Sequence, residues 1–203
     1  YVVEIPRVVG IQEPLEFPPS PGFSSPLPLT FVPGPRLDGV QLAAPLALKG
    51  QGILHKSDQG YVILNLEHAD LAQQAASMDG ADGFLVEEMV TNPIFELLVG
   101  IRRDSQYGIH LTLASGGTMT ELWRDSRSLI LPVDGPVISD ALAALKLAPV
   151  LYGFRGQPAA DMESTINQIL ALCDLITSDH SIVAIEVNPL MITSNKAVVA
   201  DAL

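Results

Sequence analysis

The sequence of 203 residues is long enough for one large or two small domains with a hydrophobic core. Its 48% hydrophobic and 17% charged residues indicate a globular protein, and its formal net charge of -12 argues against nucleic acid as a partner, because phosphate contacts need a basic surface. We expect neither a membrane-spanning segment nor a signal peptide, because no apolar run approaches the required length.

Residues 1–42 form a proline-rich segment that differs from the rest of the chain. Nine of the sixteen prolines lie in it, and this density opposes long helices and central strands. We predict an extended segment, which serves as a linker or arm or forms an incomplete first subdomain. Because the chain begins with Tyr1 rather than Met, we expect it to be a fragment of a longer protein.

Residues 43–203 are predicted to form one domain of the α/β (α+β) class, in which strands and helices alternate. The predicted strands are Pro45–Lys49, Tyr61–Leu66, Phe84–Met89, Glu96–Ile101, His110–Ala114, Leu129–Pro132, Ile182–Ile185 and Ala197–Val199, and the predicted helices are Ala69–Met78, Val137–Leu147 and Met162–Ile176. Asp161 is the expected N-cap of the last helix. Cys173 belongs to the apolar pattern of that helix, which indicates a buried structural thiol. As the single cysteine it excludes an internal disulfide framework and fits a reducing cytoplasm.

A glycine-rich loop, Gly50–Gly60, connects the first two strands of the domain. Such a loop can cradle phosphate with its backbone N–H groups, and Lys49 at the end of the preceding strand can neutralise the charge. The spacing is not that of a Walker motif, so a P-loop is excluded. The alternative is an ordinary hairpin in which His55 and Lys56 are incidental.

Acidic and glycine-rich strand ends occur in the middle of the domain. Alternation along a strand sends Glu87 and Glu88 to opposite faces, and Glu96 begins the next predicted strand. Taken alone, these residues are interpreted as a solvated acidic strand end. The paired glycines Gly116 and Gly117 allow close backbone approach, although a tight hairpin is the simpler interpretation.

The most informative segment lies between the last two predicted strands. Glu186, Asn188 and Asp201 leave the ends of paired strands, so their side chains can converge on one point. Carboxylate and amide oxygens suit Mg²⁺ that also holds nucleotide phosphates. An acidic turn with a hydrogen-bonded Asn is the alternative.

Taken in order, these motifs resemble the ATP-grasp domain of the ADP-forming acyl-CoA synthetases, a family related to the succinyl-CoA synthetase beta subunit. The resemblance covers roughly residues 43–203. The family usually has a second glycine where this chain has Tyr61, and the first forty residues do not resemble the family's N-terminal subdomain. The series is Lys49, His55-Lys56-Ser57-Asp58, Leu85-Val86-Glu87, Glu96, Gly116-Gly117, Arg155-Gly156, Glu186-Val187-Asn188-Pro189-Leu190 and Asp201.

The resemblance implies an ATP-grasp fold with bound ATP or ADP and Mg²⁺. Asn188 and Asp201 match the Mg²⁺ ligands, Glu186 matches an acid that orients a phosphohistidine, and His55 matches a relay histidine of one branch of the family. The residues implied to bind the nucleotide are Lys49 for the phosphates, Gly60 in the phosphate loop, Glu87, Glu88 and Val90 in the hinge strand beside adenine, and Glu96 for the ribose hydroxyls.

The activity implied is that of an acid–thiol ligase, in which phosphate passes from ATP through a phosphohistidine so that a carboxylic acid is joined to CoA. The CoA and acyl sites of the family lie on a CoA-ligase domain or alpha subunit. We therefore expect a nucleotide-binding half-enzyme in the cytoplasm that is inactive without that partner and binds neither nucleic acid nor membrane.

Two other functions stay open. A degenerate, non-catalytic ATP-grasp module with a regulatory or assembly role is favoured by Tyr61 and by the atypical first forty residues. A different ATP-grasp ligase, which joins a carboxylate to an amine, is disfavoured by the segment His55-Lys56-Ser57-Asp58.

Overall fold

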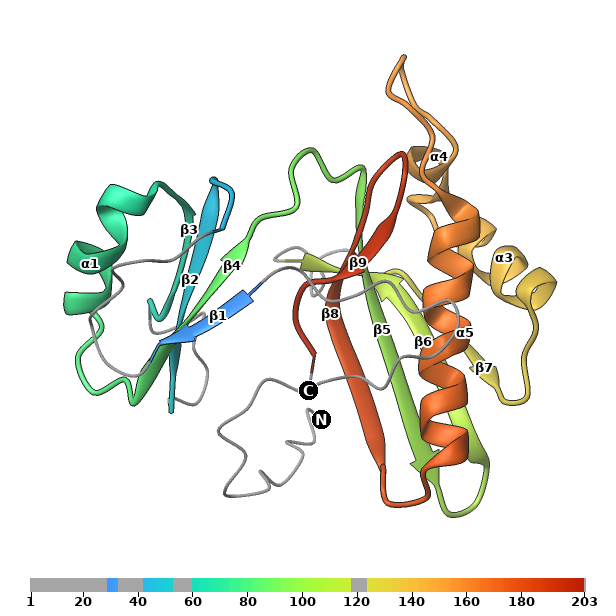
Figure 1. Cartoon of the computed structure of the whole chain (residues 1–203). Coiled ribbons are helices and arrows are strands. Elements are labelled where there is room, and N and C mark those ends of the chain that lie inside the picture. The colour runs from blue at the N-terminus through green and yellow to red at the C-terminus, as the bar shows by residue number, and fades with distance from the viewer. Residues whose placement is uncertain (1–28, 33–41, 53–59, 118–123, 203) are drawn as a thin grey trace. The chain divides into compact units, whose positions relative to one another are not determined.

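The computed structural model describes residues 29–32, 42–52, 60–117 and 124–202, and these residues form two compact units that divide between Thr91 and Asn92 (Figure 1). Each unit contains an antiparallel sheet and at least one helix. The predicted mixed α/β class is therefore confirmed. Among the described residues, no helix is both long enough and apolar enough to cross a membrane.

The smaller unit is a four-stranded antiparallel sheet with one helix. Its strands lie in the order β1-β4-β2-β3, with bounds β1 Leu29–Val32, β2 Leu46–Gln51, β3 Val62–Leu66 and β4 Gly83–Glu88, and its helix α1 is His68–Ala76. Alternate residues of β2 and β4, including Leu48 and Val86, are fully buried in a cluster with Leu71 of α1. The opposite face of these strands is therefore the one that carries Lys49 and Glu87.

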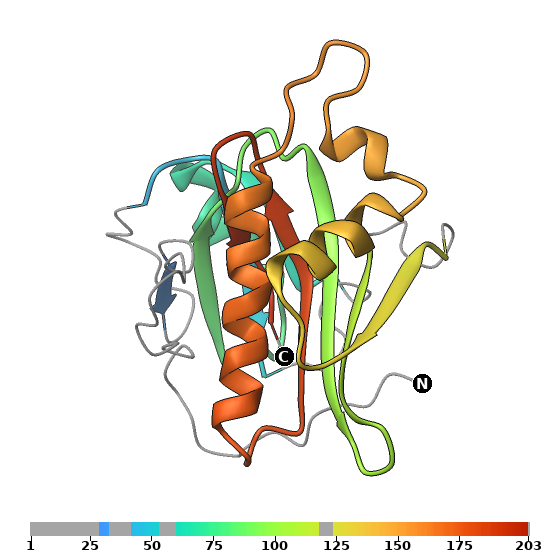
Figure 2. The same cartoon turned by 90° about the vertical axis from the view of Figure 1, so that its right-hand side faces the viewer.

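The larger unit is a five-stranded antiparallel sheet with three helices on one face. Figure 2 shows α3 and α5 lying across that face. The strand order is β7-β6-β5-β8-β9, with bounds β5 Phe95–Asp104, β6 Gly108–Ser115, β7 Ser126–Ile130, β8 Ala184–Ile192 and β9 Ala197–Val199, and the helices are α3 Gly135–Ala143, α4 Ala148–Leu151 and α5 Met162–Ser178.

Helix α5 forms as the sequence pattern predicts. The Asp161 carboxylate accepts a hydrogen bond from the Ser164 N–H at 2.9 Å, so Asp161 is the N-cap. One side of the helix, which includes Ile169, Leu172 and Ile176, is fully buried in a cluster with residues of β5, β6 and β8. This packing holds the central strands in place from one face.

Three predicted elements differ from the structure. The helix predicted over 137–147 ends at Ala143, and a separate short helix, α4, follows it. The strand predicted over 129–132 runs instead over Ser126–Ile130, with Pro132 beyond its end. Within the proline-rich segment, Leu29–Val32 forms a strand, which pairs with β4 at the sheet edge, where proline-rich neighbours are tolerated.

The last predicted hairpin also differs, and the difference changes the site. The strand predicted over 182–185 is β8, which starts at Ala184 and continues through Glu186 and Asn188 to Ile192. Its pairing with β5 shifts register between Leu97 and Val99, so Pro189 lies at an irregularity of the strand rather than after its end. Glu186 and Asn188 therefore belong to a paired strand, whereas we expected them to follow one.

We predict that Cys173 reacts very slowly with a thiol reagent at neutral pH. The side chain is 5% exposed, and burial raises the pKa of its thiol to about 12, so almost no thiolate forms. Absorbance of the released thiolate of the reagent measures the rate. The same protein unfolded in urea is the control and should react at the rate of a free cysteine; equally fast reaction of the folded chain would contradict the buried position.

Candidate functional site

The predicted site residues fall into two sets, one in each unit. In the smaller unit, Lys49 on β2 and Glu87 on β4 form an ion pair, with 2.8 Å between Lys49 Nζ and Glu87 Oε2. Lys49 pairs in register with Leu85, and Glu87 pairs with Ala47, so the two charged residues are diagonal neighbours on one face. Their side chains are only 12% and 9% exposed, which strengthens the attraction relative to a surface pair.

The two consecutive glutamates have different surroundings, as alternation along the strand predicts. Glu87 meets Lys49, whereas Glu88 accepts a hydrogen bond from the Ala43 N–H at 2.7 Å through its Oε1. Directly after β4, the Met89 N–H donates to the Pro45 carbonyl at 2.9 Å. The chain leading to Val90 is thus hydrogen-bonded at two consecutive residues, Glu88 and Met89, to the segment that precedes β2.

The glycine-rich loop is described only at its two ends. Residues 53–59, with His55, lie outside the described residues, whereas Gly60 has a φ of +77° and open space where a side chain would begin. Tyr61 packs against the hydrophobic core of the smaller unit and against Gly50, where a Cβ atom would lie 2.9 Å from the tyrosine ring. Its hydroxyl donates to the Asp79 carbonyl. Tyr61 is therefore part of the packing of this unit.

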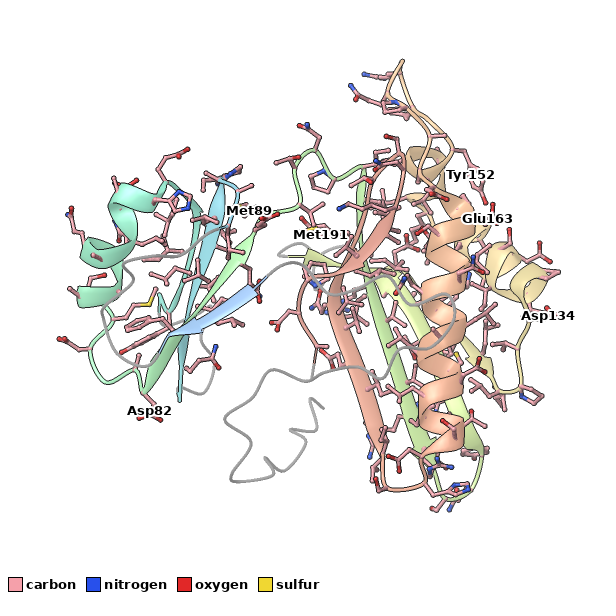
Figure 3. All side chains as sticks on the ribbon, viewed as in Figure 1. Asp82, Met89, Asp134, Tyr152, Glu163 and Met191 are labelled. Atoms are coloured by element: carbon pink, nitrogen blue, oxygen red, sulfur yellow. The ribbon has the colours of Figure 1, made fainter. Side chains whose placement is uncertain are left out.

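In the larger unit, Glu96 lies at the start of β5. Its neighbours Phe95 and Leu97 are buried against the helices, so the Glu96 side chain is on the other face of the sheet. Met191, which pairs with Glu96 in register, lies on that same face, away from α5 (Figure 3).

The paired glycines come directly against Glu96. The Gly116 N–H donates to the Glu96 carbonyl at 2.7 Å, and a Cβ on Gly116 would lie 2.8 Å from the backbone carbon of Leu97. Gly117 has a φ of +73°, and a Cβ there would overlap Oε2 of Glu96. Both positions therefore require glycine, one for close backbone approach and the other for close approach with a left-handed backbone.

Asn188 lies on the other side of the same glycine turn. Its Oδ1 accepts a hydrogen bond from the Gly117 N–H at 3.2 Å, so Gly117 contacts both Glu96 and Asn188. The Asn188 N–H donates to the Asp201 carbonyl at 3.1 Å, and Val187 forms a β-bridge with Ala202. The structure therefore brings together the backbones of positions 188 and 201, which we predicted to be neighbours.

Glu186 precedes Asn188 by two residues on β8, so both are on the face away from the helices. The cross-strand neighbour of Glu186 is Gly100, which has no side chain to occupy the space opposite the carboxylate. Glu186, Asn188 and Asp201 contribute only oxygen donors, the chemistry that hard divalent cations prefer. Across the described part of the chain there is no group of three or more His, Cys, Asp or Glu side chains that could hold a metal, so this set depends on the Asn188 amide.

Sequence reasoning did not assign two features of this region. From the residues alone, we interpreted Gly116 and Gly117 as a tight hairpin. The feature that could have indicated their close contacts is the pair of consecutive glycines itself. Asp125 was not considered at all, although its carboxylate is buried beside Ser115, the residue before Gly116.

Comparison with known proteins relates this geometry to one family. Residues 40–203 match the ATP-grasp domain family. The chain is 31% identical over 188 residues to a trans-feruloyl-CoA synthase from an unknown prokaryotic organism, a match that covers 82% of this chain and 26% of the synthase. It is 26% identical over 160 residues to the beta subunit of ADP-forming acetate–CoA ligase I from Pyrococcus furiosus, covering 74% of this chain and 69% of the subunit.

A solved structure has the same fold. It is the dinucleotide forming acetyl-coenzyme A synthetase 1 of Ca. Korarchaeum cryptofilum in complex with coenzyme A, Ca-AMPCP and HgCl⁺, with a TM-score of 0.75, 23% sequence identity, and coverage of 87% of this chain and 84% of that chain. The predicted ATP-grasp fold is thus confirmed. The chain spans about a quarter of the length of the trans-feruloyl-CoA synthase that it matches.

We predict that Gly117→Ala destabilises the larger unit more than Gly156→Ala does. Both glycines have positive φ, at +73° and +82°, but only a Cβ on Gly117 meets another atom, namely Oε2 of Glu96. The left-handed backbone alone should cost about 1–2 kcal/mol of unfolding free energy in each variant, and displacement of the flexible Glu96 carboxylate should add a smaller cost at Gly117.

Urea denaturation of both variants measures the difference. Replacing the obstructing carboxylate in the double variant Glu96→Ala/Gly117→Ala should bring the cost back toward that of Gly156→Ala, after correction for Glu96→Ala alone. Equal destabilisation by the two single glycine variants would contradict the close contact between Glu96 and Gly117.

Proposed function

This chain belongs to the ATP-grasp domain family, and we propose that it is the nucleotide-binding part of an ADP-forming acyl-CoA synthetase, which exchanges phosphate between ATP or ADP and a phosphohistidine. The similarity to the beta subunit of an ADP-forming acetate–CoA ligase supports this assignment. The observation that carries it is the single turn at Gly117, which contacts both Glu96 and Asn188 beside the backbone of Asp201.

Magnesium binding is proposed for Asn188 and Asp201. The donor set fits a hard cation, because Asn188 presents an amide oxygen and Asp201 an exposed carboxylate. The two residues are far apart in the sequence, but their backbones are hydrogen-bonded to each other. The bound ion would offset the charge of the nucleotide phosphates during transfer. Glu186, on the same face as Asn188, is proposed to orient the phosphohistidine.

Lys49 is proposed to contact the outer phosphates of ATP. The ion pair with Glu87 limits the conformations of the long lysine side chain, so less entropy is lost when a phosphate binds. Gly60, at the end of the glycine-rich loop, is proposed to present its backbone N–H to phosphate.

The remaining nucleotide contacts are proposed for the hinge and for β5. The backbone of Glu87, Glu88 and Val90 would bind the adenine edge, which requires that this segment be held in place, as it is by the contacts of Glu88 with Ala43 and of Met89 with Pro45. The Glu96 carboxylate would accept hydrogen bonds from the ribose hydroxyls.

The steps that lead from ATP to an acyl-CoA require groups other than these nucleotide and metal ligands. We propose that a histidine nitrogen attacks the γ-phosphorus of ATP, so that an N–P bond forms and the P–O bond to ADP breaks, and that this phosphate later activates a carboxylic acid for attack by CoA. His55 stays a prediction as a relay histidine. The CoA and acyl sites are proposed to lie on a CoA-ligase domain or alpha subunit, and the assembly is proposed to be cytoplasmic.

A non-catalytic ATP-grasp module is the second candidate. Tyr61 stands where the family usually has a glycine, and its ring fills space beside Gly50 in the core of the smaller unit. Such a module would still bind nucleotide but would not exchange phosphate with a histidine when the CoA-ligase partner is supplied. Transfer of labelled phosphate from ATP to the partner therefore separates the two candidates.

We predict that Asn188→Ala or Asp201→Ala abolishes Mg²⁺-dependent ATP binding and leaves the fold largely intact, because each removes an oxygen ligand from the proposed site. Calorimetry with ATP in the presence and absence of Mg²⁺ measures the effect, and circular dichroism checks the fold. Asp174→Ala is a matched control, since Asp174 is an exposed carboxylate on α5 of the same unit. Unchanged affinity in both site variants would exclude the metal assignment, and an unaltered chain that binds no nucleotide would refute the proposed function.

We also predict that Lys49→Ala weakens binding of ATP more than binding of AMP. A charge-assisted contact to the outer phosphates should be worth about 1.5–3 kcal/mol, and AMP lacks those phosphates. Competition binding with both nucleotides measures the two losses, and Lys146→Ala, which removes an exposed lysine of the larger unit, is the control for net charge. Equal losses for ATP and AMP would mean that Lys49 has a structural role through Glu87.

A further inference from the structure

Asp125 is a buried carboxylate with no part in the proposed nucleotide contacts. It lies just before β7 and is 3% exposed. Oδ1 accepts the Lys146 N–H at 2.9 Å, and Oδ2 accepts the Leu147 N–H at 3.2 Å and lies 3.4 Å from the Ser115 hydroxyl. The Asp125 carbonyl also accepts the Ser115 N–H, at 3.1 Å. These donors replace the water that a buried carboxylate would otherwise need.

The contacts of Asp125 lead directly to the glycine turn. Ser115 is 4% exposed and is the last residue of β6, so the next residue along the chain is Gly116. The Gly116 N–H donates to the Glu96 carbonyl, and the Gly117 N–H donates to Asn188 Oδ1. A displacement of Ser115 would therefore move both glycine N–H groups relative to the residues that they contact.

The other end of this connection is anchored to the helical layer. Lys146 and Leu147 lie between α3 and α4, where Leu142, Leu145 and Leu151 are buried in the main cluster of the larger unit. Their backbone N–H groups donate to Asp125 rather than continuing the helix. A single carboxylate thus joins the segment between α3 and α4 to Ser115, the residue before the two glycines.

We propose that Asp125 is a positioning residue, which holds the Ser115–Gly117 turn so that the Gly117 N–H can orient Asn188. This inference rests on the proposed function for its ligand-binding consequence but not for its structural one. A carboxylate is required because two backbone donors converge on it. An amide at this position would offer only one acceptor oxygen and would direct an NH₂ group at the other donor.

The first test needs no ligand. Hydrogen exchange of the Gly116 and Gly117 amides should become at least about tenfold faster in Asp125→Asn than in the unaltered chain, because the turn loses its anchor. Asp134→Asn is the matched control: Asp134 caps the start of α3, where its carboxylate accepts the Val137 N–H at 3.0 Å (Figure 3). That variant alters the same helix from its other end and should leave exchange at the two glycines unchanged.

The second test follows the effect to the ligand. Asp125→Asn should weaken Mg²⁺-ATP binding at least about tenfold while changing AMP affinity without Mg²⁺ less than about twofold, because the displaced turn disturbs Asn188, a proposed ligand of the metal. If Asp125→Asn fails to fold, Ser115→Ala can be used instead, because it removes only the hydroxyl contact. It should also weaken Mg²⁺-ATP binding more than AMP binding, but by a smaller factor.

The outcomes separate this inference from the proposed function. An unaltered chain without nucleotide affinity refutes the proposed function, and the exchange measurement still decides the role of Asp125. Unchanged glycine exchange in both Asp125→Asn and Ser115→Ala, or equal acceleration in Asp134→Asn, overturns the positioning role. Equal weakening of Mg²⁺-ATP and AMP would assign Asp125 to general stability of the unit and would likewise overturn it.

Discussion

Strand β5 is the constraint on which the candidate site of the larger unit depends. It pairs with β6 on one side and with β8 on the other, so residues far apart in the sequence lie on either side of its first residues. Glu96 lies between Gly116, which directly follows β6, and Met191 of β8, and the bulged part of β8 that contains Asn188 is next along that strand. Packing of α3 and α5 against the opposite face holds the three strands, because their alternate residues, such as Leu97 and Val99, are fully buried there.

The charged residues of the two units differ in whether they form an ion pair. In the smaller unit a lysine and a glutamate already neutralise each other at 2.8 Å, and both are mostly buried. In the larger unit, no salt bridge to Glu186 or Asp201 occurs among the described residues, and the Asn188 side chain accepts a hydrogen bond from the Gly117 N–H. The smaller unit thus presents a lysine whose charge is balanced within the sheet, whereas the larger unit presents oxygen atoms of the kind that hard cations prefer.

Sequence reasoning succeeded where the determining interactions are local. The Asp161 cap, the apolar side of α5 and the opposite orientations of Glu87 and Glu88 each follow from residues within one or two turns or steps of the chain. It failed at the end of α3, where the N–H groups of Lys146 and Leu147 turn to a carboxylate at position 125. It also placed Glu186 and Asn188 after a strand, because the hydrophobic run over 182–185 stops at Glu186 and does not reveal that the strand continues through a bulge.

The amino-acid sequence by itself determined most of the elements that form, that the protein is of the mixed α/β class, and, through the order of its motifs, its resemblance to the ATP-grasp family. Those properties depend on local propensity, alternation and motif spacing, all of which can be read along one chain. Only the tertiary structure decided that Gly117 contacts both Glu96 and Asn188, that Lys49 pairs with Glu87, and that Asp125 anchors the glycine turn. Such contacts depend on strand register and on the packing of distant elements, and a shift of one residue in register would reverse the faces on which these side chains lie.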